Sequence, residues 1–270
     1  MGEEHRKRVP TELESEILRH IADEDERDHS RWLALISCAL VCKAWTRHVR
    51  SHLYYAINMN AIRGSVQLKY LHVYTHLRPF LREFTWAQTE LIQSTYCFNA
   101  SNADFIKEVA PTVTKLRFRR VNYSSLKVPL REAISTFANI KELDMTGSIF
   151  EDWTTVVHVI SSFPFLSRLA MPSIATFHDD GPDDPEISYP PPSRLVYIKL
   201  APGCEAETVR WIHRGSPIPN IQTVEAGSQI DSKVLAELLR SLGGGLRHLV
   251  IHIDPSRASL IWASLRQILF

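Results

Sequence analysis

The residue types best suited to chemistry in this chain are cysteine and histidine, the usual protein ligands for transition metals. Cys38 and Cys42 are four residues apart, so a helix would place both on one face. His248 and His252 alternate with Val250 in a strand-like stretch, so they would share one face of a strand. Neither pair has further ligands at a short spacing. We therefore expect small buried cysteines, solvent-exposed histidines and no bound metal.

Sequence motifs for catalysis or for cofactor binding are absent. The sequence has no G-x-G-x-x-G or G-x-x-x-x-G-K-[ST] loop, no G-x-S-x-G nucleophile motif and no H-E-x-x-H zinc motif. The glycine run at 243–245 is followed by Leu and Arg, which is typical of a helix end before a strand. No base can be identified for a serine or cysteine nucleophile. The sequence therefore predicts neither an enzymatic activity nor a cofactor.

Composition and charge are those of an ordinary globular protein. The 270 residues are 44% hydrophobic and 23% charged, and the net charge of +1 gives no global field toward nucleic acid or anionic membrane. The basic run at 117–120 lies inside a strand-like pattern and forms no extended basic face. The longest apolar stretch, residues 32–42, is too short to cross a bilayer. No disulfide framework or secretory signal is visible, so we expect a cytoplasmic or nuclear protein without nucleic-acid or membrane partners.

Three amphipathic helices are predicted between residues 9 and 57, with an acidic run at 23–28 after the first of them. Thr11 and Glu14 form a capping box that begins the first helix. The apolar residues recur at helical spacing in three groups: Leu13, Ile17, Leu18 and Ile21; Leu33, Ile36 and Leu40; and Trp45, Val49, Leu53 and Ile57. A unit of this size has too little core to stand alone and suits docking onto a partner.

This segment resembles an F-box, the motif by which substrate receptors attach to SCF-type cullin–RING ubiquitin ligases. F-box sequences typically open with Leu-Pro, E-L and I-L pairs and close with L-V-C-K-x-W. The matching residues here are Val9-Pro10, Glu12-Leu13, Ile17-Leu18 and Leu40-Val41-Cys42-Lys43-Ala44-Trp45. The opening departs from the family at Val9, and the acidic run lengthens the first connection.

The resemblance implies a surface that binds the adaptor subunit of the ligase. Its residues would be Pro10, Leu13, Ile17, Leu40, Val41 and Cys42, with Lys43 at the rim. Trp45 would instead anchor the core of the three helices. The alternative is that all of these residues pack inside a helical cap, because apolar stripes are usually core.

The rest of the chain carries a repeated pattern, apolar-x-x-apolar-x-apolar. Its seven fourth positions are Phe84, Leu116, Leu143, Leu169, Ile198, Val224 and Leu249. Their intervals of 32, 27, 26, 29, 26 and 25 residues match the leucine-rich-repeat period of roughly 20–29, apart from the first. Helical patterns fall between these strands, at residues 129–138, 151–163, 205–214 and 231–242. Alternating strands and helices predict short parallel strands with helices on the outer side.

The repeats depart from the leucine-rich consensus at the ninth position, which normally holds Asn or Cys. Here it holds Thr89, Val121, Ser148, Ile174, Gly203, Gln229 and Asp254. No continuous Asn ladder can form, so we expect an irregular arc; a non-solenoid α/β domain is the alternative. The acidic, Pro-rich residues 178–193 predict a surface loop, either a spacer or a binding element. Residues 256–270 have the pattern of a final amphipathic helix.

Taken together, these patterns predict an α/β protein with an F-box-like helical domain at 8–58 and a leucine-rich-repeat-like domain at 59–270. The resemblance implies a substrate-recognition subunit that binds the SCF adaptor subunit, and through it cullin, while the repeats hold an unknown protein target. Two other classes stay open. One is a ligase-independent repeat scaffold, and the other is a hydrolase or transferase built on an α/β sheet.

Overall fold

A single curved sheet forms the centre of the protein. The computed structural model describes residues 11–23, 29–41, 43–59, 62–87, 100–172, 189–215, 218–227 and 229–252. Within these ranges the sheet contains eight strands, all parallel, in the order in which they occur along the chain. The strands are β1 (Ala56–Asn58), β2 (Glu83–Ala87), β3 (Lys115–Arg119), β4 (Glu142–Asp144), β5 (Arg168–Ala170), β6 (Tyr197–Lys199), β7 (Thr223–Ala226) and β8 (His248–Ile251).

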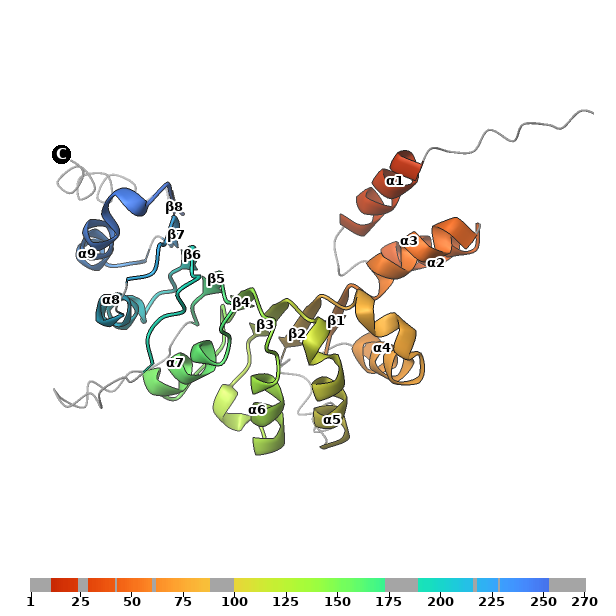
Figure 1. Cartoon of the computed structure of the whole chain (residues 1–270), viewed down its shortest axis with the longest axis horizontal. Coiled ribbons are helices and arrows are strands. Elements are labelled where there is room, and N and C mark those ends of the chain that lie inside the picture. The colour runs from red at the N-terminus through yellow and green to blue at the C-terminus, as the bar shows by residue number, and fades with distance from the viewer. Residues whose placement is uncertain are drawn as a thin grey trace, which may run out of the picture.

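Helices cover one side of this sheet. The α-helices are α1 (Thr11–Asp23), α2 (His29–Ala39), α3 (Lys43–Leu53), α4 (Ile62–Val73), α5 (Ala100–Val109), α6 (Val128–Ser135), α7 (Trp153–Ser161), α8 (Glu205–Arg214) and α9 (Ser232–Leu242). The 3-10 turns are η1 (Thr75–Phe80), η3 (Ala110–Thr112), η4 (Tyr123–Ser125) and η5 (Gly243–Gly245). Figure 1 shows α4 to α9 along the outer, convex side of the strands, with α1 to α3 gathered beyond β1. The predicted α/β class, with parallel strands and helices on one side, is confirmed.

The predicted repeat positions form one continuous row across the sheet. In register, Phe84 pairs with Leu116, which pairs with Leu143, and the row continues through Leu169, Ile198, Val224 and Leu249. Every side chain of the row is buried except that of Leu249, which is partly buried. The row is apolar because it faces the covering helices, and the neighbouring residues of each strand therefore face the other way.

Ile57 extends this row by one strand, which corrects the prediction that it continues the face of the third helix. The helix ends at Leu53, and Ile57 pairs with Phe84 in β1. The carbonyl of Tyr55 accepts hydrogen bonds from the backbone N–H groups of Arg82 and Glu83, at 2.9 and 3.0 Å. The chain thus turns directly from α3 into the sheet, and residues 56–58 of the predicted helical segment belong to the sheet.

Helices α6 to α9 lie within or close to their predicted ranges. The Asp152 carboxylate caps α7 by accepting from the Thr155 N–H at 2.6 Å, and the Asp231 carboxylate accepts from the Lys233 N–H at 2.7 Å at the start of α9. Gly243 ends α9 with a φ of +50°, a conformation that side chains with a Cβ disfavour. Helices α4 and α5 have weaker patterns and were not predicted.

Several sequence-based predictions fall partly or wholly outside the described residues. Among the ninth repeat positions, Thr89, Ile174 and Asp254 lie outside, whereas Val121 and Ser148 are buried. The predicted final helix at 256–270 and most of the loop at 178–193 also lie outside. The end of that loop is attached to the outer layer, because the Tyr189 carbonyl accepts a hydrogen bond from the Trp211 Nε1–H of α8 at 2.9 Å.

The first three helices have a small core of their own. Leu18, Leu35 and Val49 are fully buried together, and their cluster is separate from the large core between the sheet and helices α4 to α9. The partly buried residues packed around them are Ile21, Cys38, Ala39, Trp45 and Leu53. No helix in the described ranges combines the length and the apolar character needed to cross a membrane.

Candidate functional site

Five of the seven residues predicted to bind an adaptor are described by the structure, and all five are exposed on the N-terminal helices and the turn between α2 and α3. In α1, Leu13 is 54% exposed and Ile17 is 44% exposed. At the turn between α2 and α3, Leu40 is 81% exposed and Val41 is 66% exposed. Lys43, the predicted rim residue, is also exposed. The remaining two predicted residues, Pro10 and Cys42, lie outside the described residues.

The core of the three helices explains why these apolar side chains stay outside. Helix α1 turns Leu18 and Ile21 toward α2 and α3, so the predicted single stripe of Leu13, Ile17 and Ile21 is divided between solvent and core. Leu33 of α2, which sequence reasoning assigned to a helical stripe, is exposed as well. Exposed aliphatic side chains grouped on a small helical unit are typical of a protein-binding surface.

The turn that carries Leu40 and Val41 is held by backbone groups. The Leu40 N–H donates to the Ser37 carbonyl and the Val41 N–H donates to the Cys38 carbonyl, each at 3.1 Å. The Thr46 hydroxyl donates to the Ala39 carbonyl at 2.8 Å. Because neither exposed side chain takes part in these bonds, the turn keeps its shape while both side chains remain available to a partner.

The second candidate surface is the face of the sheet that no α-helix covers in Figure 1. Here the residues on either side of the buried row form two polar rows across the strands. The first row is Glu83, Lys115, Glu142, Arg168, Tyr197, Thr223 and His248, and the second is Thr85, Arg117, Asp144, Ala170, Lys199, Glu225 and Val250. Neighbouring strands therefore place acids beside bases over most of the face.

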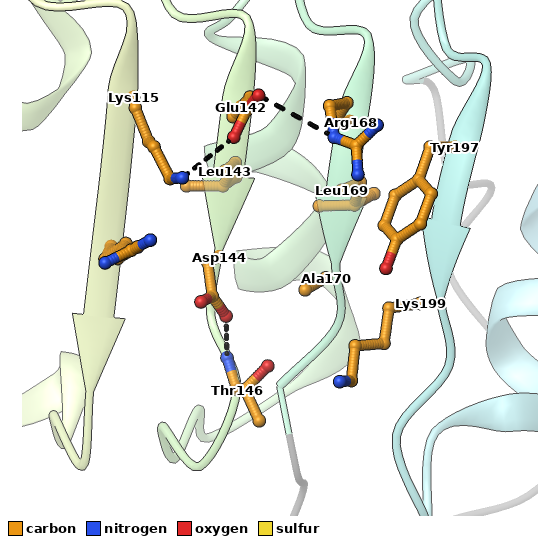
Figure 2. Close-up of a pocket in the computed structure, with 11 residues that line it drawn as sticks. Lys115, Glu142, Leu143, Asp144, Thr146, Arg168, Leu169, Ala170, Tyr197 and Lys199 are labelled. Atoms are coloured by element: carbon orange, nitrogen blue, oxygen red, sulfur yellow. Dashed lines mark hydrogen bonds and ion pairs between the residues drawn. The ribbon is translucent and has the colours of Figure 1, made fainter. Parts of the chain in front are cut away.

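Ion pairs join the acids and bases of strands β2 to β5. Lys115 lies between two carboxylates, with its Nζ 3.1 Å from Glu142 and 3.8 Å from Glu83. Arg117 contacts Glu83 at 2.6 Å, and the Nε of Arg168 lies 3.7 Å from Glu142. Figure 2 shows the contacts of Glu142 as dashed lines. Because Glu83 is buried, its pairs with Lys115 and Arg117 are screened less than free surface pairs.

Glu225 of β7 contacts polar side chains from β6 and from the end of β8. Its carboxylate accepts a hydrogen bond from the Tyr197 hydroxyl, and it contacts Lys199 Nζ at 2.5 Å and His252 Nε2 at 2.9 Å. Burial acts to raise the pKa of Glu225, but the hydrogen bonds from Lys199, Tyr197 and His252 outweigh it and lower the pKa to about 2. Burial, followed by the hydrogen bond to Glu225, raises the pKa of Tyr197.

The Glu225→Gln variant is expected to lose about 1–3 kcal/mol of stability at pH 7, because Lys199 is left without its counter-charge. The folded-state pKa of about 2 lies below the ordinary value of 4.5. The contribution is therefore complete above about pH 4.5 and is lost as the pH falls toward 2. Urea unfolding of wild type and variant at pH 7 and pH 3 measures this effect. We expect the difference between their free energies of unfolding to be less than half as large at pH 3 as at pH 7. Glu132→Gln, on the exposed side of α6, is the control; an equal difference at both pH values would contradict the assignment.

A shallow depression of about 190 Å³ lies in the middle of the open face. Leu143, Leu169 and Ala170 line its floor. The side chains of Leu143 and Leu169 are buried on the helix side of the sheet, so the strand backbone and the Ala170 methyl group form this floor. Figure 2 shows Asp144 on one side of Ala170, and Tyr197 and Lys199 on the other. Ala170 pairs in register with residues Asp144 and Lys199 of the two neighbouring strands, so the small methyl group makes the gap. The arrangement suits binding of a side chain. The sequence analysis assigned no role to the polar residues around the depression, because their spacing matches no known motif.

The two histidines, His248 in β8 and His252 just after it, lie at the end of the described part of the sheet. His248 is exposed, as expected, and His252 is hydrogen-bonded to Glu225. Among the described residues no group of three or more His, Cys, Asp or Glu side chains is placed to hold a metal ion. Cys38 is partly buried and Cys204 is buried; burial raises the pKa of the Cys204 thiol to about 12, so this thiol stays protonated at neutral pH.

No family model matches the sequence, and no curated protein matches it.

Proposed function

We propose that this chain is an F-box protein with irregular leucine-rich repeats, the substrate-receptor subunit of an SCF-type cullin–RING ubiquitin ligase. The helices α1 to α3 bind the adaptor subunit, which connects the chain to cullin. The curved sheet holds a protein target. The chain forms no bond itself, and it acts by raising the local concentration of a target lysine near the charged ubiquitin-conjugating enzyme.

The observation that carries this proposal is the exposure of Leu40 and Val41 at the turn between α2 and α3. These residues open the segment that matches the F-box ending, and they would be expected inside if the helices served only as a cap. Leu13 and Ile17 of α1, from the opening part of the motif, are exposed as well. Trp45, from the end of the same motif, packs against the small core, as an anchoring residue should.

The regular register of the sheet supports the repeat part of the proposal. Residues 25 to 32 apart in the chain pair directly across neighbouring strands from β2 to β8, which is the geometry of stacked repeats. The open face of the sheet carries ordered polar side chains on rigid strands. Such a surface is suited to binding a protein with selectivity, since its side chains are already held in place before binding.

Co-purification with the SCF adaptor subunit tests the proposal. We expect the full chain and the adaptor to elute together at equal stoichiometry in size-exclusion chromatography, and the pair to bind the N-terminal part of cullin. A folded chain that ignores the adaptor would instead be a ligase-independent scaffold. A chain that binds the adaptor without recruiting cullin would separate adaptor binding from ligase function.

A further inference from the structure

Asp144 differs from the other acids of the open face in its partners. Its carboxylate accepts a hydrogen bond from the Thr146 N–H at 3.0 Å, and it has no ion pair with any residue that the structure describes. By contrast, each of the four cations around the depression lies near an acid: Lys115 and Arg168 near Glu142, Arg117 near Glu83, and Lys199 near Glu225. Among the described acids of the open face, Asp144 therefore carries the negative charge that a ligand can neutralise without breaking an ion pair.

We propose that the depression over Ala170 binds a lysine or arginine side chain from an extended segment of the protein target, with the cationic group on Asp144. This inference rests on the proposed function, in which the open face of the sheet holds the target. Asp144 is partly buried at the edge of the depression, so an incoming ammonium or guanidinium group reaches it from solvent. A charge-assisted hydrogen bond at such a site is stronger than one between neutral groups.

The space above Ala170 fits the aliphatic part of such a side chain. Asp144 and Lys199 stand two strand spacings apart, which is roughly 9–10 Å between their Cα atoms. Between them the floor consists of the Ala170 methyl group and the backbone of the strands, because the leucine side chains of the buried row face the helices. The methylene groups of a lysine or arginine can pack on the Ala170 methyl group while the charged end contacts a carboxylate.

The cationic side chains around the depression are already bound to neighbouring groups, so the site favours a cationic ligand over an anionic one. Arg168 stacks over the Tyr197 ring at 4.1 Å, and the Tyr197 hydroxyl is bonded to Glu225. Lys199 is held by the same carboxylate at 2.5 Å. An anionic ligand would have to compete with these carboxylates for their cations and would also approach Asp144, so like-charge repulsion opposes it.

A peptide array tests this assignment with the full chain as the probe. The array carries heptapeptides with random flanking residues and a fixed central Lys, Arg, Gln or Glu. We expect the wild-type chain to retain Lys- and Arg-centred peptides about tenfold more strongly than Gln- or Glu-centred ones. Equal retention of the four classes, preference for Glu, or no retention of any class would overturn the proposal.

Three variants make the test specific to the depression. Asp144→Asn keeps an oxygen for the Thr146 N–H and should lose the preference for Lys and Arg. Asp144→Lys should favour Glu-centred peptides, because the charge is reversed. Ala170→Phe fills the gap and should lower the retention of all four classes. The control Glu132→Gln removes an exposed acid from α6 and should keep the wild-type preference. A preference for Lys and Arg that persists in a folded Asp144→Lys variant would refute the site.

Adaptor binding is measured on the same preparations, so that failure of this inference and failure of the proposed function are distinguishable. Adaptor binding without a preference for basic peptides would leave the proposed function standing and remove the site. If the chain does not bind the adaptor but its preference for basic peptides depends on Asp144, the peptide site is supported and the proposed ligase function is contradicted.

Discussion

The Leu40→Asp variant is expected to lose adaptor binding while it stays folded. Leu40 is 81% exposed, and its side chain packs in neither core cluster. A charge at this position therefore disturbs little in the free chain. In the complex the same carboxylate would be buried without a partner, which costs about 3–5 kcal/mol. That cost weakens binding by about 100-fold to several thousand-fold.

Titration calorimetry of the adaptor into wild-type and variant chains measures this loss. The matched control is Val128→Asp, which places the same charge on an exposed apolar residue at the start of α6, outside α1 to α3. The control should bind the adaptor as the wild type does. A folded Leu40→Asp chain with wild-type affinity would remove the F-box assignment and leave a repeat scaffold.

Phe84→Ala is expected to cause a large loss of stability. Phe84 is fully buried in β2, and its ring lies 5.6 Å from the ring of Phe137 and 5.8 Å from that of Trp86. Its backbone pairs with both Ile57 and Leu116, so the side chain sits inside the row that joins the strands. Removal of a buried aromatic ring costs about 3–5 kcal/mol, a substantial part of the roughly 5–15 kcal/mol of a typical domain.

Urea unfolding followed by circular dichroism measures the loss as a lower midpoint at an unchanged slope. Phe165→Ala is the matched control, because Phe165 is exposed and its ring lies 5.0 Å from the Arg194 guanidinium. That change should shift stability by less than about 1 kcal/mol. Similar effects of the two substitutions would mean that Phe84 does not lie in the core.

The two candidate surfaces depend on different cores. The adaptor-binding residues lie on helices packed around Leu18, Leu35 and Val49, and the open face depends on the large core under the sheet. Substitutions on one surface should therefore leave binding at the other unchanged, provided that the chain stays folded.

Sequence periodicity was sufficient for much of the fold. The spacing of Phe84, Leu116 and the later repeat positions predicted seven strands, and these residues pair with one another in the sheet. Such a pattern is informative because a strand that packs against helices must be apolar on that face. Helices α7 and α9 were predicted from the helical pattern of their sequences, which also reflects a local preference.

Apolar spacing was less informative in the N-terminal helices, where three segments share one small core. Ile57 fitted a helical stripe by its spacing from Leu53, but the chain turns at Tyr54 and Tyr55 and pairs Ile57 with β2. Leu13 and Ile17 likewise fitted one stripe with Ile21. Only the packing of α1 on α2 and α3 decides which of these apolar residues are covered, since a small core buries just part of each stripe.

The polar sites were decided by the tertiary structure alone. The sequence determined that the residues beside each buried repeat position face away from the helices, because side chains alternate along a strand. It could not determine that Glu225 meets Tyr197 and His252, 28 and 27 residues away, or that Ala170 leaves a gap between Asp144 and Lys199. Those contacts depend on the register between strands, which is set by the stacking of whole repeats and by no single segment of the chain.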